Sequence, residues 1–457
     1  MSFFREPAAT ARLPAAQIDK VYPRRRYRVF VSIFIGYMGY YFVRNTTSVL
    51  SGILHLSATD IGIISCASFL AYGVSKFVSG LLSDRSNARF FLSAGLFLSG
   101  LVNVLIGWLP GILTSVTLFT TMYLLNGWIQ GMGYPPGAKT LVYWYDARER
   151  ITWGTLWNLS HNVGGALAPL IIGFSFGWVG DSALEKAQAA FIVPGVLCMA
   201  MSVLVGVLQL DRPVSVGLPP VEEWRGSAPP PDPVVPPPMA DILKTTLFGN
   251  RKLLCCCLYG AFVYILRYGI VAWAPRFLSD AAESGGKGMG KLASMGGFSV
   301  FEIGGIAGML LAGYLSVRVF RNSKPLTNVA FLLFTILLLA IYWWMPAGQA
   351  WLYWNYAVLV LLGLSVYGPV MFIGLYAMEL VPKAAAGAAS GLSGTFSYIL
   401  GSIMATLGMG VVVDHLGWGA AFVLLIGAAL GAIGFSLLSR DRSLEFSEPP
   451  PKGGPTR

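Results

Sequence analysis

Charged side chains are scarce in this sequence. Only 12% of its 457 residues are Asp, Glu, Lys or Arg, whereas an ordinary soluble domain carries about 25%. Hydrophobic residues make up 55% of the chain, and the mean hydropathy is +0.65. One soluble core could not bury so much apolar side chain, because soluble domains split into smaller units well below this length. We therefore predict a polytopic membrane protein.

Cysteine and histidine are also few. The five cysteines fall in apolar stretches, three of them in succession at 255–257, and the three histidines lie far apart. We therefore expect no disulfide framework and no metal site. The sequence has no phosphate-binding loop with its lysine, no nucleophile elbow and no carboxylate pair with acid–base spacing. We expect no cofactor and no enzyme activity, and we see no signal peptide at the basic N-terminus.

Apolar runs of about 20 residues, the length of a spanning helix, recur along the chain. A first set of predicted spans covers 28–50, 61–82, 91–109, 113–135, 152–177 and 189–210. A second set covers 253–278, 294–317, 326–345, 351–376, 386–411 and 418–438. The fold class predicted is all-α, with twelve transmembrane helices in two pseudo-symmetric halves.

A proline-rich charged stretch, VEEWRGSAPPPDPVVPPPM, separates the two sets. Such a composition cannot form a packed core, so we predict an extended linker. The expected organisation is then an N-terminal segment, a six-helix half, a linker, a second six-helix half and a C-terminal tail, at 1–27, 28–210, 211–250, 251–438 and 439–457.

Lysine and arginine are unevenly distributed. If both termini face the cytoplasm, twenty-four of the 32 lie in the termini and inner loops, and four lie in or beside the outer loops. Positive residues accumulate on the cytoplasmic side of membrane proteins, so we predict that both termini are cytoplasmic. The net charge of +11 reflects these loops, and no nucleic-acid partner is expected.

Four cations remain in apolar stretches, namely Arg44, Lys76, Lys139 and Arg267. A charge at the bilayer centre costs about 2.5–3.5 kcal/mol on insertion scales, so each indicates a functional site. Arg44 and Arg267 occupy the first span of each half. Halves related by a two-fold axis would bring both guanidiniums to one central cavity, where paired forks suit a phosphate. The alternative is that an arginine pairs with a buried carboxylate, Glu302 or Glu379.

Other polar side chains in the spans extend this candidate site. Lys76 shares a helix face with Tyr72, but it could equally snorkel to the inner surface. His161 lies three residues after Asn158 and either donates to phosphate or is a structural hydrogen-bonding group. Six phenols at apolar positions either pack or supply neutral donors around an anion: Tyr37, Tyr41, Tyr72, Tyr264, Tyr367 and Tyr398.

The loop GLLSDRSNAR at 80–89 has the form G-x-x-x-D-R-x-x-x-R. Its glycine allows close helix approach, and pairs formed by Asp84, Arg85 and Arg89 would latch helix ends on the cytoplasmic side. This loop resembles the signature loop of the major facilitator superfamily. The matching segment of the second half, GYLSVRVFRN, carries Val317 where an Asp is expected, so we expect a weaker latch there.

Over nearly its whole length the chain resembles the organophosphate:phosphate antiporters of that superfamily. The matching stretches are ARLPAAQID, GYYFVRN, AYGVSKFVSGLLSDRSNAR, NGWIQGMGYPPGAK, LWNLSHNVGG, GLPPVEEW, VYILRYGI, YGPVMFIGLYAMELVPK and GTFSYILGS. The likeness is greatest to the members that carry glycerol 3-phosphate. Members that carry or sense hexose phosphates share several stretches, so the motifs identify the family better than the substrate.

The resemblance implies roles for particular residues. It implies that Arg44 and Arg267 hold the phosphate and that His161 joins them during transport. The residues that would line the cavity are Lys76, Asn158 and the six tyrosines named above.

Three positions depart from the family pattern. Asn45 stands where a lysine is usual, and Ala272 stands where relatives often have an acid or amide, which looks like the deletion of an ion pair. Tyr134 stands where the glycerol-phosphate carriers have a tryptophan. We include Tyr134 among the binding residues, although it could only pack the helix bend at Pro135 and Pro136.

The resemblance implies import of an organophosphate in exchange for inorganic phosphate, by rocking of the two halves. Glycerol 3-phosphate is the leading substrate and hexose 6-phosphate the alternative; Ser390 and Ser393 lack the charged pair of one hexose-phosphate relative, which favours the smaller substrate. A membrane sensor that binds sugar phosphate without transport is the rival function. We expect a monomer in the lipid bilayer of a bacterial inner membrane.

Overall fold

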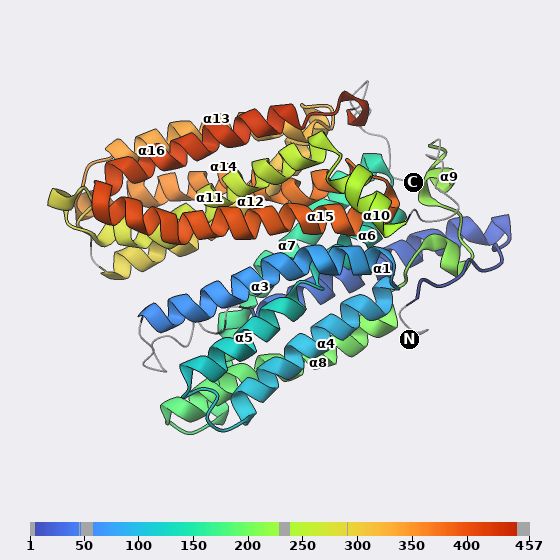
Figure 1. Cartoon of the computed structure of the whole chain (residues 1–457), viewed down its shortest axis with the longest axis horizontal. Coiled ribbons are helices and arrows are strands. Elements are labelled where there is room, and N and C mark those ends of the chain that lie inside the picture. Colours follow the sequence, from blue (N-terminus) through green and yellow to red (C-terminus); the bar gives the residue numbers. More distant parts are fainter. Residues whose placement is uncertain (1–4, 45, 47–57, 228–237, 290, 446–457) are drawn as a thin grey trace. The chain divides into compact units, whose positions relative to one another are not determined.

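The computed structural model describes residues 5–44, 46, 58–227, 238–289 and 291–445. Within these ranges the regular structure is helical, apart from an isolated antiparallel bridge between Arg5 and Ser86. The chain divides into two compact units, which are described separately (Figure 1). The first comprises Met1–Ile242 together with Val381–Thr395, and the second comprises Leu243–Leu380 together with Phe396–Arg457.

The first unit is a bundle of long helices. Their bounds are Ala15–Phe42 (α1), Ala58–Asp84 (α3), Ala88–Trp108 (α4), Val116–Gln130 (α5), Tyr134–Trp144 (α6), Ala147–Ser175 (α7) and Ala183–Leu208 (α8). In this bundle α4 packs along α8, α3 along α5, and α1 against α7 and α8. Fully buried apolar side chains such as Ile106, Phe119 and Phe191 form its core. Most of α15 (Ala386–Phe396) also belongs to this unit.

The second unit contains five long helices. They are Arg251–Ser279 (α11), Lys291–Arg318 (α12), Lys324–Trp344 (α13), Leu352–Ala377 (α14) and Met409–Leu438 (α16). Here α12 packs along α14, and α16 packs against α11 and α13. Two π-helical segments, Ser397–Ser402 (η8) and Met404–Gly408 (η9), lead from α15 into α16.

Nine helices of the described residues are long and apolar enough to cross a membrane. The predicted spans at 386–411 and 418–438 fall within one of the nine, a helical run from Lys383 to Leu438. It breaks at Gly417, whose φ of 79° favours glycine. Of the other predictions, 28–50 extends beyond the described residues, and 113–135 contains the shorter α5. The all-helical membrane fold is confirmed, and nine spans in the described ranges are consistent with the predicted twelve.

Helix boundaries follow local capping chemistry. The side chains of Asn87 and Asn250 accept the backbone N–H of Arg89 and Leu253, and so cap α4 and α11. The Pro135–Pro136 pair lies at the start of α6, where a missing N–H costs nothing. Tyr134 therefore begins a new helix, whereas the sequence placed it at the end of the preceding span.

Parts of the predicted linker fold onto the first unit. Val221–Arg225 forms a short helix (α9), and its Trp224 stacks on Tyr22 of α1 with ring centroids 4.2 Å apart. Glu222 of α9 also pairs with Lys383 at 2.7 Å. The prediction of an extended linker is therefore wrong for this stretch, because its apolar and aromatic side chains find partners. The proline-rich residues 228–237 lie outside the described residues.

Candidate functional site

Arg44 follows α1 in the first unit and is surrounded by neutral donors and acceptors. Its Nε donates to Gln130 Oε1 at 3.0 Å, and its Nη1 donates to the Tyr41 hydroxyl at 2.8 Å. The guanidinium carbon also lies 4.3 Å from the ring centroids of Tyr41 and Tyr72. These contacts orient a planar cation inside an apolar bundle without neutralising its charge.

Lys76 of α3 lies in the same cluster. Its ammonium is 4.4 Å from the ring centroid of Tyr134 and 5.7 Å from that of Tyr72, and the residue is buried. Its side chain also passes directly over Gly394 of α15, where a Cβ would stand 2.7 Å from Nζ. The structure therefore places Lys76 among the phenols, whereas snorkelling would direct its ammonium to the surface.

Aromatic side chains connect Arg44 to α7. The ring of His161 lies 5.4 Å from that of Tyr41, and Tyr37 contacts the rings of both Tyr41 and Tyr134 at 5.5 Å. Asn158, one turn before His161 on α7, is buried and donates to the Gly154 carbonyl of its own helix at 2.8 Å. Each residue predicted for the first half's site, Arg44, Lys76, His161, Asn158 and four tyrosines, thus falls in one largely buried cluster.

The second unit has a comparable cluster around Arg267 of α11. The guanidinium carbon lies 4.8 Å from the ring centroid of Tyr367, 5.2 Å from Tyr268 and 6.0 Å from Tyr264. Tyr398 of η8 packs against Tyr264 at 5.1 Å. Arg267 Nε is buried without a hydrogen-bond partner among the described residues. A buried polar atom of this kind is available to a ligand.

Glu302 of α12 introduces a carboxylate beside this second cluster. The Tyr367 hydroxyl donates to Glu302 Oε1, while the Tyr367 ring faces Arg267. Arg267 and the half-buried Glu302 carboxylate are thus linked through the Tyr367 phenol and not by a direct ion pair among the described residues. Glu379, the other candidate, instead pairs with Lys324 at 2.5 Å.

The side chains of each cluster provide chemistry for an anion. Guanidinium and ammonium groups donate hydrogen bonds and positive charge, and phenols add neutral donors. No cluster of three or more His, Cys, Asp or Glu that could hold a metal exists in the ranges that the structure describes.

The predicted latch uses a different partner from the one expected. Asp84, the last residue of α3, accepts the backbone N–H groups of Gly387 and Ala388, both at 2.8 Å. The N-terminal turn of a helix attracts a carboxylate, because its N–H groups lack partners within the helix. Arg89 donates to the Gly206 carbonyl at the end of α8, and Arg85 is exposed. Asp84 thus binds a helix end directly and not through an arginine pair.

Glycines bring α3 and α15 into backbone contact at this point. A Cβ on Gly80 would stand 2.5 Å from the carbonyl oxygen of Gly387, and a Cβ on Gly391 would collide with the carbonyl oxygen of Lys76. Further along α15, the Thr395 hydroxyl donates to the Gly73 carbonyl at 2.6 Å. Only residues without a side chain fit where the two backbones approach so closely.

Sequence reasoning missed two residues of these clusters. Gln130 is a lone amide in the apolar run NGWIQGMG, and Tyr268 lies next to Arg267 and four residues after Tyr264. Both signals were present in the sequence. Glu302 was named as an alternative, but its link through Tyr367 depends on tertiary packing. Of the departures from the family pattern, Asn45 lies outside the described residues, Ala272 is exposed on α11, and Val317 lies in the last turn of α12.

Comparison with known proteins identifies the class of this fold. A family model described as Major Facilitator Superfamily matches residues 29–406. The fucose:proton symporter of Escherichia coli has a similar structure, with a TM-score of 0.67 and 15% sequence identity, covering 90% of this chain and 98% of that one. The chain belongs to the major facilitator superfamily, and this membership indicates a transporter and not an enzyme.

Relatives with curated names resemble the chain over nearly its full length. The glycerol-3-phosphate transporter of Bacillus subtilis is 38% identical, covering 96% of this chain and 98% of the relative. A probable hexose phosphate transport protein of Chlamydia pneumoniae is 35% identical over 93% and 94%. The membrane sensor protein UhpC of Escherichia coli is 32% identical over 95% and 97%. The resemblance found in the motifs is thereby confirmed.

Proposed function

We propose that this protein is a secondary transporter that exchanges an organophosphate for inorganic phosphate, with glycerol 3-phosphate as the first substrate to test. The observation that carries the proposal is the Arg44 cluster, where a guanidinium, the Lys76 ammonium and neutral phenols meet inside a membrane bundle. A guanidinium whose hydrogen bonds go to an amide and a phenol keeps its charge, which favours binding of an anion.

The second unit contributes Arg267 with its phenols. In the proposed mechanism both arginines bind the phosphoryl group, because a dianion can satisfy two guanidinium forks. His161 and Lys76 would add donors, and the tyrosines would line the rest of the site. A bound phosphoryl group offsets the positive charge of the cations, whereas the empty site retains that charge. Exchange is therefore favoured over uniport, since only the loaded carrier changes state readily.

The proposal includes an arrangement in the membrane. Both termini would face the cytoplasm, because the Lys and Arg residues accumulate in the termini and the loops on their side. The protein would act as a monomer in a bacterial inner membrane. A fusion reporter at each terminus, active only in the cytoplasm, tests the orientation, and a signal from the outer side would reject it.

Phosphate counterflow in proteoliposomes tests the function. Vesicles loaded with inorganic phosphate should take up external radiolabelled phosphate, and glycerol 3-phosphate should compete. An Arg276→Lys variant is a matched control, because Arg276 is an exposed arginine of α11 that pairs with Asp414 at 2.9 Å, away from the Arg267 cluster. Uptake that does not depend on internal phosphate would reject the antiport mechanism.

The named relatives supply two further candidates. A hexose phosphate that competes better than glycerol 3-phosphate in the same assay would assign the chain to hexose-phosphate exchange. Binding of a phosphorylated sugar, measured by calorimetry, without any counterflow would support the sensor function.

A further inference from the structure

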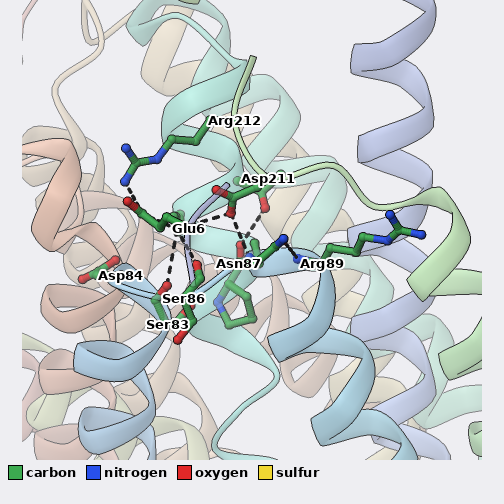
Figure 2. Close-up of polar contacts among 12 residues, drawn as sticks. Glu6, Ser83, Asp84, Ser86, Asn87, Arg89, Asp211 and Arg212 are labelled. Carbon is green, nitrogen blue, oxygen red and sulfur yellow. Dashed lines mark hydrogen bonds and ion pairs between the residues drawn. The ribbon is translucent and has the colours of Figure 1, made fainter. Parts of the chain in front are cut away.

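The N-terminal segment is bound to the first unit ahead of α1. The backbone N–H of Thr10 donates to the Val214 carbonyl at 3.1 Å, and that of Leu13 donates to the Gly217 carbonyl at 2.8 Å. Figure 2 shows the consequence for Glu6, whose carboxylate lies between Arg212 and the loop that follows α3. This segment is therefore fixed in place and can act on the loop.

Glu6 binds the ammonium of Lys139, a residue of α6 whose side chain is only 1% exposed. Lys139 Nζ lies 2.8 Å from Glu6 Oε1, 2.7 Å from the Ser86 carbonyl oxygen and 3.3 Å from Asp211 Oδ1. A buried ammonium requires such acceptors, because an unpaired charge away from water is costly. Lys139, one of the four cations singled out in apolar stretches, thus has its role outside the Arg44 cluster.

Two residues after α8 complete this cluster. Asp211 Oδ1 accepts the Ala88 N–H at 2.8 Å, and Arg212 donates to Glu6. The short loop between α3 and α4 is therefore held at both ends. Lys139 binds the Ser86 carbonyl just after the C-terminal end of α3, and Asp211 binds the Ala88 amide at the N-terminal end of α4, as the helix dipoles favour.

Asp84 occupies the last position of α3, inside the region that this cluster holds. The carbonyl of the preceding residue, Ser83, lies 3.5 Å from Lys139 Nζ. Asp84 in turn accepts the two N–H groups at the start of α15. The position of the Asp84 carboxylate therefore depends on a loop whose anchor is Lys139, and Lys139 is partnered by Glu6.

We propose that Glu6 is a positioning residue for the contact between α3 and α15, acting through Lys139 on the loop that presents Asp84. An amide in place of the Glu6 carboxylate weakens the hold on Lys139, so the loop moves more freely and Asp84 leaves the α15 amides more often. The inference rests on the proposed function only in taking release of this contact as a step of the transport cycle.

Hydrogen exchange of the full-length protein in lipid nanodiscs tests the positioning role without any substrate. In Glu6→Gln, amides in a peptide that covers Gly387 and Ala388 should exchange at least fivefold faster than in the wild type, and Asp84→Asn should give a comparable change. Glu223→Gln is the matched control, because Glu223 pairs with Arg12 at 2.6 Å on an exposed surface of the same unit. It should change the rate by less than twofold. Unchanged exchange in Glu6→Gln would overturn the proposal.

Transport kinetics provide an independent test through a double-mutant cycle. Glu6→Gln should lower the maximal rate of phosphate exchange about threefold with little change in KM, because the Arg44 cluster is untouched. Glu6→Asp should restore at least half of the rate. In an Asp84→Asn background the Glu6→Gln change should have no further effect, since coupled residues are not additive. If Glu6→Gln lowers the rate by the same factor in the Asp84→Asn background as in the wild type, the proposal is overturned. Faster hydrogen exchange in a protein that shows no phosphate counterflow would reject the proposed function and leave the positioning role standing.

Discussion

Each unit contains an arginine surrounded by tyrosines, but the charged side chains near Arg44 and near Arg267 differ. In the first unit Arg44 is bonded to Gln130 and Tyr41, and the Lys76 ammonium lies in the same cluster. In the second unit Arg267 faces Tyr367, whose hydroxyl donates to Glu302. The first cluster is thus rich in positive charge, whereas a carboxylate moderates the second. In the proposed mechanism the first unit would therefore supply most of the attraction for an anion, and the second would adjust it.

The two units pair the buried Lys139 and Lys324 with different numbers of acids. Lys139 lies within the short helix α6 and is paired with acids from outside its helix, Glu6 and Asp211. Lys324 begins α13 and is paired with Glu379, which follows α14. The shared requirement is that a buried charge has a partner, and each unit meets it with residues from different elements.

The largest loss of stability is expected when the ion pair between Lys324 and Glu379 is broken. In Glu379→Gln the Lys324 ammonium, whose side chain is 1% exposed, loses its carboxylate. Leaving a buried charge without its partner costs about 3–5 kcal/mol. Thermal unfolding in detergent should show a clearly lower Tm. Glu223→Gln, which breaks an exposed pair, should cost less than about 1 kcal/mol, and equal losses in both variants would contradict the role of burial.

The next largest effect concerns the two arginines. We expect Arg44→Lys and Arg267→Lys each to lower phosphate exchange at least roughly tenfold, a loss of about 1.4 kcal/mol, because lysine offers a point charge and not a planar fork. Counterflow measures this, with Arg276→Lys as the unaffected control. An Arg267→Lys variant with wild-type rate and affinity would show that the second unit does not bind the anion.

Substitution of Glu302 tests the difference in charge between the Arg44 and Arg267 clusters. In Glu302→Gln the carboxylate that moderates the second cluster becomes neutral, so the phosphate concentration for half-maximal exchange should fall about threefold. A threefold change in this concentration corresponds to about 0.7 kcal/mol. Competition binding measures the change. Weaker phosphate binding would mean that Glu302 orients Tyr367 and does not limit the positive charge.

Tyr134 tests whether the wall of the first cluster selects the substrate. The Tyr134 ring centroid lies 4.4 Å from the Lys76 ammonium and 5.5 Å from the ring centroid of Tyr37. Tyr134→Phe should change the preference between glycerol and hexose phosphates about twofold, near 0.4 kcal/mol, with phosphate self-exchange intact. Loss for every substrate alike would assign Tyr134 to scaffold packing.

A small effect is expected on stability in acid. Outside the membrane spans, a hydrogen bond from Arg440 holds the pKa of Glu445 below its ordinary value, and one from Lys252 does the same for Asp441. A lowered folded pKa adds stability above the unfolded pKa, and this stability is lost as pH falls through the folded value. Because Lys252 is nearly half exposed, Asp441→Asn should cost less than about 1 kcal/mol at pH 7. The difference from wild type should shrink as the pH falls below about 4, the unfolded pKa, and vanish below the folded pKa.

Composition and the pattern of single helices are enough to predict much of the fold and part of the site. Apolar run length located most spans, and the cost of a charge in lipid singled out Arg44 and Arg267. The sequence could not predict the partner of Asp84, because backbone amides of Gly387 and Ala388 have no distinctive sequence pattern and lie about 300 residues away. The Glu6–Lys139 pair could not be predicted either, because only tertiary packing brings the N-terminal segment to α6.

The glycines where α3 meets α15 also affect the conformational entropy of that contact. At Gly80, Gly387 and Gly391 the two helices meet backbone to backbone, so few rotamers are fixed when they meet and few are released when they part. Ordering a long side chain costs up to about 2 kcal/mol of conformational entropy, and this interface largely avoids that cost. At these glycines the two helices therefore meet with little loss of side-chain entropy, and the specific hold on the contact comes from Asp84 and the α15 amides.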